Sequence, residues 1–145
     1  MPRTAPRASF VFPVRVYYED TDAAGIVYYA NYLKFFERAR TEWLRTLGFE
    51  QRGLAEQGIA FAARSIVVEY LKPARLDDAL NVVSEIESVG RVQVVFAQRI
   101  LRAEGAELLL TASMRIACIE PAAMRAAAMP TDIYETFKAL TGKST

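Results

Sequence analysis

The amino-acid sequence predicts an α+β fold in which one antiparallel sheet of about five strands wraps around one long helix. Three observations predict it. Apolar residues recur every three or four positions over residues 31–47, which is the period of an amphipathic helix. Long strand-like runs follow, and Gly-containing segments typical of hairpin loops separate the last three of them. Because a helix and a sheet each bury one apolar face, the simplest packing wraps this sheet around this helix.

The first two elements are a strand and the long helix. Residues Phe12–Glu19 alternate in polarity, with Tyr18 on the same side as two valines, and the turn-forming run DTDAAG ends this strand. Three bulky aromatic residues share the apolar stripe of the helix, Asn31–Leu47, so we expect burial on more than one of its sides. We expect Asn31 to cap the N-terminus of this helix.

The later elements are mainly strands. A short helical stretch is expected near Glu50–Gln57, and a last helix, Thr131–Leu140, follows a proline. The four strands between them are expected near Ile59–Lys72, Ala79–Val89, Arg91–Arg102 and Glu107–Ile119. In the fourth strand, the even-numbered residues from Leu108 to Cys118 are expected to share one side. Strands of this length leave edges unpaired, so we expect chains to associate edge to edge.

The chain is expected to form a single domain over residues 10–145, because it contains no repeat, low-complexity tract or linker. Residues 1–9 are polar, lack the apolar segment of a secretory signal, and predict a disordered tail. A cytoplasmic location follows by default. No apolar run approaches the roughly 20 residues that cross a bilayer, so a membrane protein is not expected.

Composition excludes several classes of function. The chain has 145 residues and a net charge of +1, from 18 basic and 17 acidic residues, so it lacks the strong positive charge typical of nucleic-acid binders. It contains no histidine, which excludes Ser-His-Asp and Cys-His catalysis and histidine zinc sites. A lone cysteine, Cys118, excludes an intrachain disulfide and a cysteine-rich metal cluster. An enzyme of this composition must use a carboxylate, a tyrosine or backbone dipoles.

The segment Tyr17–Tyr32, YYEDTDAAGIVYYANY, concentrates unusual residues. It holds three carboxylates, a glycine and five of the seven tyrosines, and it joins the first strand to the N-terminus of the long helix. A helix N-terminus exposes unpaired N–H groups and a partial positive charge. A carboxylate just ahead of it could attack a carbonyl or orient water, while the N–H groups hold the oxyanion.

Four readings of this segment compete on residue types alone. Asp20 and Asp22 can be turn formers with no chemical role. A calcium loop starting at Asp20 would need an oxygen ligand at Ala24 and a glutamate at Asn31, and a helix rather than a strand ahead of it. A phosphotransfer Asp-x-Asp would need a parallel α/β domain, which the hairpin pattern contradicts. The fourth reading is carbonyl or thioester chemistry at the helix terminus.

Longer motifs resemble a known family. The run R-V-x4-T-D-x2-G-I-V-Y-Y-A-N-Y at residues 15–32, followed by FFERAR at residues 35–40, resembles the 4-hydroxybenzoyl-CoA thioesterase family of hotdog-fold proteins. VEYxxPARLDD at residues 68–78 and FxQRI at residues 96–100 resemble its branch associated with the Tol-Pal gene cluster. The likeness covers about residues 12–140. It implies a hotdog domain that hydrolyses an acyl-CoA to CoA and a free acid.

By this resemblance Asp22 is the catalytic aspartate, acting either as the nucleophile or as a general base on water. A free aspartate has a pKa of about 3.9, so it is ionised at pH 7 but weakly basic. The resemblance also implies that Gly25, Tyr29 and Ala30 bind the substrate, with the backbone N–H groups near the last two polarising the thioester carbonyl. No metal or other cofactor is implied. Active sites of such proteins commonly form between subunits, so a homodimer or homotetramer is expected.

One departure and several weaker candidates accompany this assignment. Many members of the branch have His at the position of Tyr29, whereas members that hydrolyse 4-hydroxybenzoyl-CoA have Tyr. Tyr29 either donates a hydrogen bond or shapes the pocket. Glu37 is a helical carboxylate of the kind some hotdog enzymes use, and an ordinary ion-paired role is its alternative. Lys72, Arg75 and Arg91 could bind CoA phosphates or be solvated surface charges.

The sequence therefore predicts an acyl-CoA thioesterase. The alternative from another class is a hotdog protein that binds acyl-CoA or an acyl-carrier protein without catalysis. A hotdog dehydratase is disfavoured, because that group generally relies on a catalytic histidine. Acyl-chain preference, and CoA against an acyl-carrier protein as the carrier, stay open.

Overall fold

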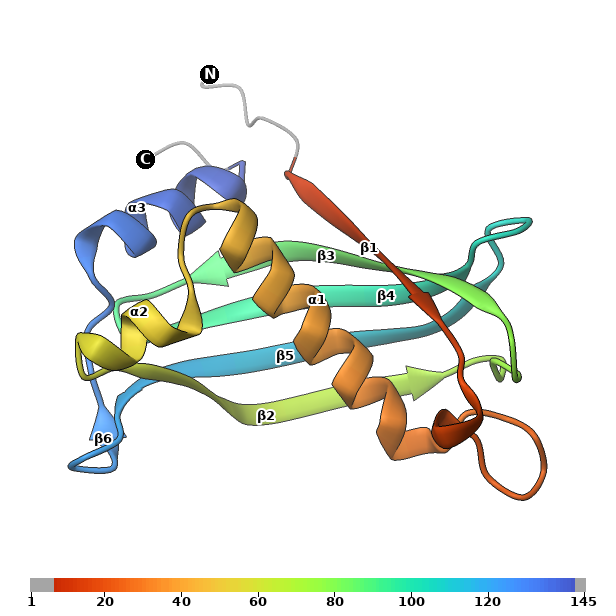
Figure 1. Ribbon diagram of the computed structural model, residues 1–145. Helices are drawn as coiled ribbons and strands as arrows, with labels where there is room; N and C mark the ends of the chain where they lie inside the picture. Colours follow the sequence, from red (N-terminus) through yellow and green to blue (C-terminus); the bar gives the residue numbers. More distant parts are fainter. Residues whose placement is uncertain (1–6, 143–145) are drawn as a thin grey trace.

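A computed structural model gives the fold and describes residues 7–142. Its strands form one antiparallel sheet in the order β1-β3-β4-β5-β2, and a short strand, β6, pairs with the end of β5 (Figure 1). The strands are β1 (Ser9–Arg15), β2 (Ala60–Tyr70), β3 (Ala79–Val89), β4 (Gln93–Arg102), β5 (Leu108–Glu120) and β6 (Arg125–Ala126). The helices are α1 (Tyr32–Thr46), α2 (Gln51–Glu56) and α3 (Thr131–Leu140). This architecture confirms the predicted fold class.

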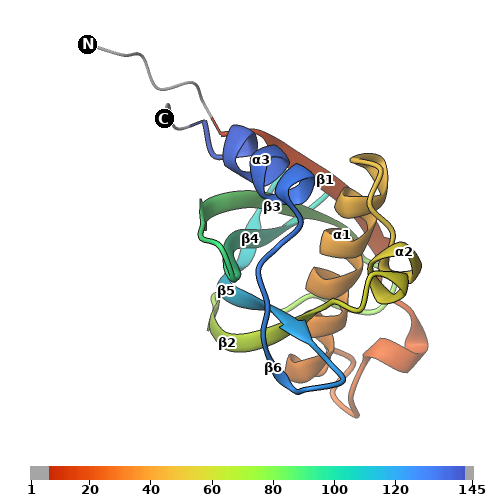
Figure 2. The same cartoon turned by 90° about the vertical axis from the view of Figure 1, so that its left-hand side faces the viewer.

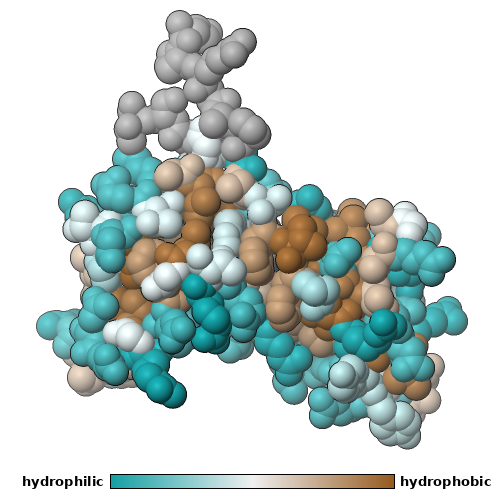
Figure 3. Space-filling view, turned by 45° about the horizontal axis from the view of Figure 1, so that its top comes forward, coloured by the Kyte–Doolittle hydropathy of each residue, from teal (hydrophilic) through white to brown (hydrophobic). Residues whose placement is uncertain are grey.

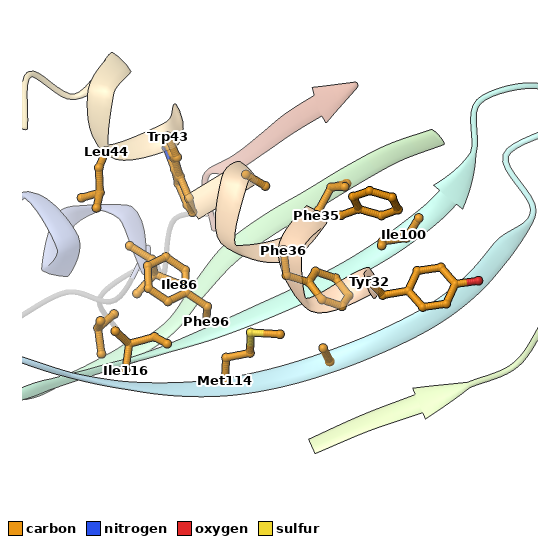
Figure 4. Packing of buried hydrophobic residues seen from close by; sticks show 14 of the residues in the cluster. Tyr32, Phe35, Phe36, Trp43, Leu44, Ile86, Phe96, Ile100, Met114 and Ile116 are labelled. Atoms are coloured by element: carbon orange, nitrogen blue, oxygen red, sulfur yellow. The ribbon is translucent and has the colours of Figure 1, made fainter. Parts of the chain in front are cut away.

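Helix α1 lies against the concave side of the curled sheet (Figure 2). Its stripe of aromatic and aliphatic side chains meets the inward-facing residues of the strands (Figure 4). Phe35 and Phe36 are both completely buried although they are adjacent in sequence, so the helix is covered on more than one side, as predicted. A buried aromatic side chain of this kind stabilises the fold by about 1.5–3 kcal/mol relative to an exposed one.

The hairpin predictions are confirmed, because β3, β4 and β5 pair antiparallel in sequence order. The predicted alternation along β5 is wrong at its first residue. The register shifts where Leu101 pairs with Leu108, and Leu109 is the extra residue of this bulge. Leu109 is therefore fully buried and Leu108 is exposed. A bulge reverses the inward and outward sides of a strand, and periodicity alone does not reveal it.

The first strand begins earlier and ends earlier than predicted. It starts at Ser9, and the Ala8 N–H donates to the Leu140 carbonyl at 3.1 Å, so the predicted disordered tail includes residues with ordered contacts. Residues 1–6 lie outside the described part. At its other end β1 gives way to a 3₁₀ turn over Tyr18–Asp20, and Tyr18 points into solvent rather than sharing the inward side.

Within residues 7–142, none of the helices combines the length and the apolar character that a bilayer-spanning segment needs.

Candidate functional site

The segment between β1 and α1 is a compact loop held by backbone hydrogen bonds. Thr21 and Val27 form an isolated antiparallel bridge, and the Asp22 N–H donates to the Ile26 carbonyl at 2.9 Å. Between them the Gly25 N–H donates back to the Asp22 carbonyl at 3.0 Å, with Gly25 at a φ of +78° that favours glycine. The glycine therefore has a structural reason to be there: it closes the turn that presents Asp22.

The two aspartates of this loop have different environments. Asp20 is buried, and its carboxylate accepts the Tyr17 N–H at 2.8 Å and an N–H of the Asn31 amide at 2.6 Å. Asp22 is exposed in the single chain, and its carboxylate accepts the Ala24 N–H at 2.9 Å. The turn-forming reading therefore describes Asp20, which ties the strand end to the helix start. Asp22 keeps a solvent-accessible carboxylate.

Asp22 does not lie in a pocket that is enclosed within one chain. The sheet curls around the helix, as expected (Figure 2). Asp22, near the entrance of this helix, is nevertheless exposed on the surface of the single chain. An active site shared between subunits would leave its carboxylate accessible in this way.

The structure does not support the two alternative functions of this loop, phosphotransfer and calcium binding. The sheet is antiparallel throughout, whereas the phosphotransfer reading required a parallel α/β domain. The two aspartate side chains engage different backbone and amide groups rather than converging. Across residues 7–142, no group of three or more acidic, Cys or His side chains is placed to hold a metal ion.

The helix entrance presents free backbone donors. A 3₁₀ turn over Tyr29–Asn31 runs directly into α1. The first N–H groups of a helix have no partner within it, and those of Tyr29 and Ala30 have none elsewhere in the described chain. Asn31 occupies the predicted cap position, but its side chain does not cap the helix, because its amide donates to Asp20. Two unpaired N–H groups therefore follow the Asp22 loop.

Tyr70, at the end of β2, contacts the entrance of α1. The sequence did not predict it as a site residue. Its hydroxyl donates to the Tyr29 carbonyl at 2.9 Å, and its ring meets that of Tyr29 edge-on with centroids 6.4 Å apart. A peptide unit is planar, so the direction of the Tyr29 carbonyl also sets the direction of the Ala30 N–H on its other side. Burial, and to a lesser extent Tyr29, raise the pKa of Tyr70, which keeps its hydroxyl protonated at neutral pH.

The neighbouring tyrosines make one cluster around this entrance. The Tyr28 and Tyr29 rings lie 4.7 Å apart, and the interaction with the Tyr29 hydroxyl raises the pKa of Tyr28. The buried Tyr32 hydroxyl accepts the Ala74 N–H at 3.0 Å and thereby anchors the first turn of α1 to the chain after β2. An open pocket of about 320 Å³ lies beside the cluster. It is lined by Ile26, Val27, Tyr29, Tyr32, Tyr70, Leu71, Lys72 and Pro73.

The three basic residues suggested for CoA binding are not brought together within one chain. Lys72 borders the tyrosine pocket, where its ammonium pairs with Glu107 at 2.9 Å. Arg75 is exposed and its backbone forms a bridge with Ile26, next to the Asp22 loop. Arg91 lies in the β3–β4 hairpin at the opposite end of the molecule, with its guanidinium 5.9 Å from the centre of the Tyr134 ring (Figure 1). Lys72 and Arg75 are therefore the two that lie on the side of the candidate site.

Comparison with known proteins adds a family and a set of relatives. A family model described as the thioesterase-like superfamily matches residues 16–137. Acyl-CoA thioester hydrolase YbgC of Escherichia coli is 49% identical over 129 residues, covering 89% of this chain and 96% of that protein. Acyl-CoA thioesterase YbgC of Haemophilus influenzae is 46% identical over 129 residues, with 88% and 93% covered.

Solved structures share the fold. A probable thioesterase from Bartonella henselae superposes with a TM-score of 0.79 at 35% identity, over 85% of this chain and 100% of that one. A DHNA-CoA thioesterase from Staphylococcus aureus superposes with a TM-score of 0.85 at 26% identity, over 94% and 97%. These likenesses confirm the hotdog fold expected from the motifs, while assignment to the Tol-Pal branch stays a prediction.

Proposed function

The chain belongs to the thioesterase-like superfamily, and from that premise we propose that it hydrolyses an acyl-CoA thioester to CoA and a free carboxylic acid. One observation supports this most directly: an accessible carboxylate, Asp22, precedes a helix entrance whose Tyr29 and Ala30 N–H groups are unpaired. A nucleophile or base together with oxyanion donors is what acyl transfer requires. The relatives named as acyl-CoA thioesterases act on the same class of substrate.

In the proposed reaction, the thioester carbonyl accepts hydrogen bonds from the entrance N–H groups, which stabilise the negative charge that develops on its oxygen. In one route an Asp22 oxygen attacks the carbonyl carbon and the C–S bond breaks. CoA leaves as a thiolate that takes a proton from water, and a second water hydrolyses the mixed anhydride. In the other route Asp22 accepts a proton from the water that attacks the carbonyl carbon, the C–S bond breaks, and the leaving CoA thiolate takes that proton from Asp22. Neither route needs an imidazole, a metal or a prosthetic group.

We further propose that the site is completed in a homodimer joined along β2. β1 and β2 are the two ends of the main strand order, and Pro13 leaves β1 without one backbone donor. β2 has 11 residues and no proline, and it leaves Ile66, Val67 and Tyr70 exposed. An edge of this kind is a template for pairing with a second chain. Figure 3 shows a different face, with the β1 and α3 side of the molecule brought forward, where hydrophobic side chains gather in two areas with hydrophilic ones between them.

The function is tested by measuring thiol release from a panel of acyl-CoAs of short, medium and aromatic acyl groups. We expect turnover of at least one member, and the panel also reports acyl preference. Parallel reactions with acyl-carrier-protein thioesters determine the carrier. Tight binding of the panel without thiol release would contradict hydrolysis and favour the non-catalytic binding protein. A cytoplasmic location stays a prediction.

Tyr70→Phe is expected to lower kcat about three- to tenfold, because it deletes one hydrogen bond that orients the Ala30 N–H, and a net hydrogen bond is worth about 0.5–1.5 kcal/mol. The KM is expected to stay within about twofold, since the bond matters most when charge develops on the oxygen. Steady-state kinetics measure kcat and KM. The melting temperature in a thermal melt is expected to fall by no more than about 2–4 °C, because the same hydrogen bond contributes about 1 kcal/mol to stability. Tyr134→Phe, a matched change on α3, is the control. Equal kinetics for both variants, or a change confined to KM, would show that Tyr70 does not position the donor.

A further inference from the structure

A cavity lies beside the middle and C-terminal part of α1. Its volume is about 340 Å³, at the lower end of the roughly 300–1,000 Å³ typical of small-molecule sites. Apolar side chains from α1, α3 and the strands β2, β4 and β5 line it together with polar side chains from α1 and α2. The lining residues include Glu37, Arg40, Phe61, Ala63 and Phe96. Asp22 and the tyrosine cluster do not line it.

Arg40 is the cation in this wall, and its guanidinium is held in one orientation. Its Nη1 donates to the Oε1 of Gln98 at 2.9 Å and to the sulfur of Met114. Gln98 is almost completely buried and is itself fixed, because its Nε2 donates to the Phe36 carbonyl and to the Ser84 hydroxyl at 2.8 Å. The guanidinium carbon also lies 5.9 Å from the centre of the Phe96 ring.

These contacts leave one edge of the guanidinium available. Both Nη1 hydrogens are used, whereas Nε and Nη2 of Arg40 have no hydrogen-bond partner among residues 7–142. Every fully buried side-chain nitrogen in that range has a partner, so these two atoms are accessible to solvent. Arg40 is one of the residues that line the cavity. The Nε–Nη2 edge is one of the pairs of parallel donors with which arginine binds a carboxylate through two hydrogen bonds.

The charge of Arg40 lacks a close counter-ion. None of the ion pairs in the described chain includes it. Burial lowers its pKa to about 10, and the charge of Glu37 opposes this shift, so Arg40 is cationic at neutral pH. Glu37 lines the same cavity but is exposed, so water screens its repulsion of an anion. Charges attract more strongly where the effective dielectric constant is lower, so a partly desolvated cation attracts a ligand carboxylate more strongly than a solvated one.

We propose that this cavity is a binding site for an amphiphilic monocarboxylate. The carboxylate accepts two hydrogen bonds from the free edge of Arg40, and the apolar body packs against Phe61, Phe96 and their neighbours. The acid released by thioester hydrolysis belongs to this chemical class. The site is argued from the cavity and the arginine, so it stands or falls independently of the catalytic role of Asp22.

The test is calorimetric titration of the purified full chain with octanoate, octanamide and acetate. Octanoate is expected to bind with a measurable affinity. Octanamide, which has the same tail and no charge, is expected to bind at least about tenfold more weakly, because charge-assisted hydrogen bonds are about twice as strong as neutral ones. Acetate, which has the charge and no tail, is expected to bind more weakly than octanoate. Equal affinity for octanoate and octanamide, or no binding of octanoate, would overturn the proposal.

Variants locate the site. Arg40→Met is expected to weaken octanoate binding at least about tenfold, whereas Arg38→Met, which removes an exposed arginine from the same helix outside this cavity, is expected to change it less than twofold. Arg40→Met could unfold because Gln98 loses its partner. In that case octanoate binding is measured in Ala63→Phe, which fills the cavity and keeps the guanidinium. Unchanged octanoate binding in Ala63→Phe, or equal losses in the two arginine variants, would refute this location.

Discussion

Asp22→Asn is expected to lower kcat/KM for acyl-CoA hydrolysis by at least about a hundredfold, the usual loss when a catalytic acid–base group is removed. A neutral amide neither attacks a thioester nor accepts a proton from water. The substitution keeps an oxygen that can accept the Ala24 N–H, so the loop is expected to keep its shape. Thiol release under subsaturating substrate measures the loss, and a thermal melt checks the fold.

Glu19→Gln is the matched control for this experiment. Glu19 is an exposed carboxylate three residues before Asp22, so its replacement removes the same charge from the same segment. We expect its kcat/KM to stay within about twofold of wild type, as is usual for a surface change away from the chemistry. Retained activity in Asp22→Asn, or equal losses in the two variants, would mean that Asp22 is not the catalytic group.

Val67→Lys is expected to convert the assembled protein to monomers and to lower kcat/KM about a hundredfold, the loss that a misplacement of reacting groups by about 1 Å can cause. Val67 is 66% exposed on β2, so a lysine there is compatible with the single chain. A lysine on the β2 edge places a charge where the second chain would pair, and natural sheets use edge lysines to prevent such pairing. The activity is expected to fall because Asp22 lies on the surface of one chain and needs a second chain to exclude water.

The other sheet edge supplies the control for this prediction. Val11 is exposed on β1, and Val11→Lys makes the same chemical change on the edge that contains Pro13. Light scattering during gel filtration is expected to show a dimer for Val11→Lys and a monomer for Val67→Lys. A wild-type monomer, a dimer that survives Val67→Lys, or an active monomer would each contradict a site completed along β2.

Much of the fold follows from local patterns. The stripe over residues 31–47 predicted α1 within one residue at each end, and the last helix was predicted at its observed bounds. β3 was also predicted at its observed ends. These predictions succeeded because helices and strands repeat every 3.6 and 2 residues, so the pattern of apolar residues can be recognised from neighbouring positions. They failed at Leu108 and Tyr18, where a bulge and a 3₁₀ turn interrupt the period.

The sequence by itself determined which elements form, which residue types remain for chemistry, and, through its motifs, the family and the candidate aspartate. Only the tertiary structure decided that Asp20 ties the loop while Asp22 stays accessible, that Tyr70 holds the Tyr29 carbonyl from 41 residues away, and that Arg40 meets Gln98 across 58 residues. The physical reason is that a backbone period reports a residue's neighbours along the chain. A side chain's hydrogen-bond partner depends on how the curled sheet brings distant strands to the helix.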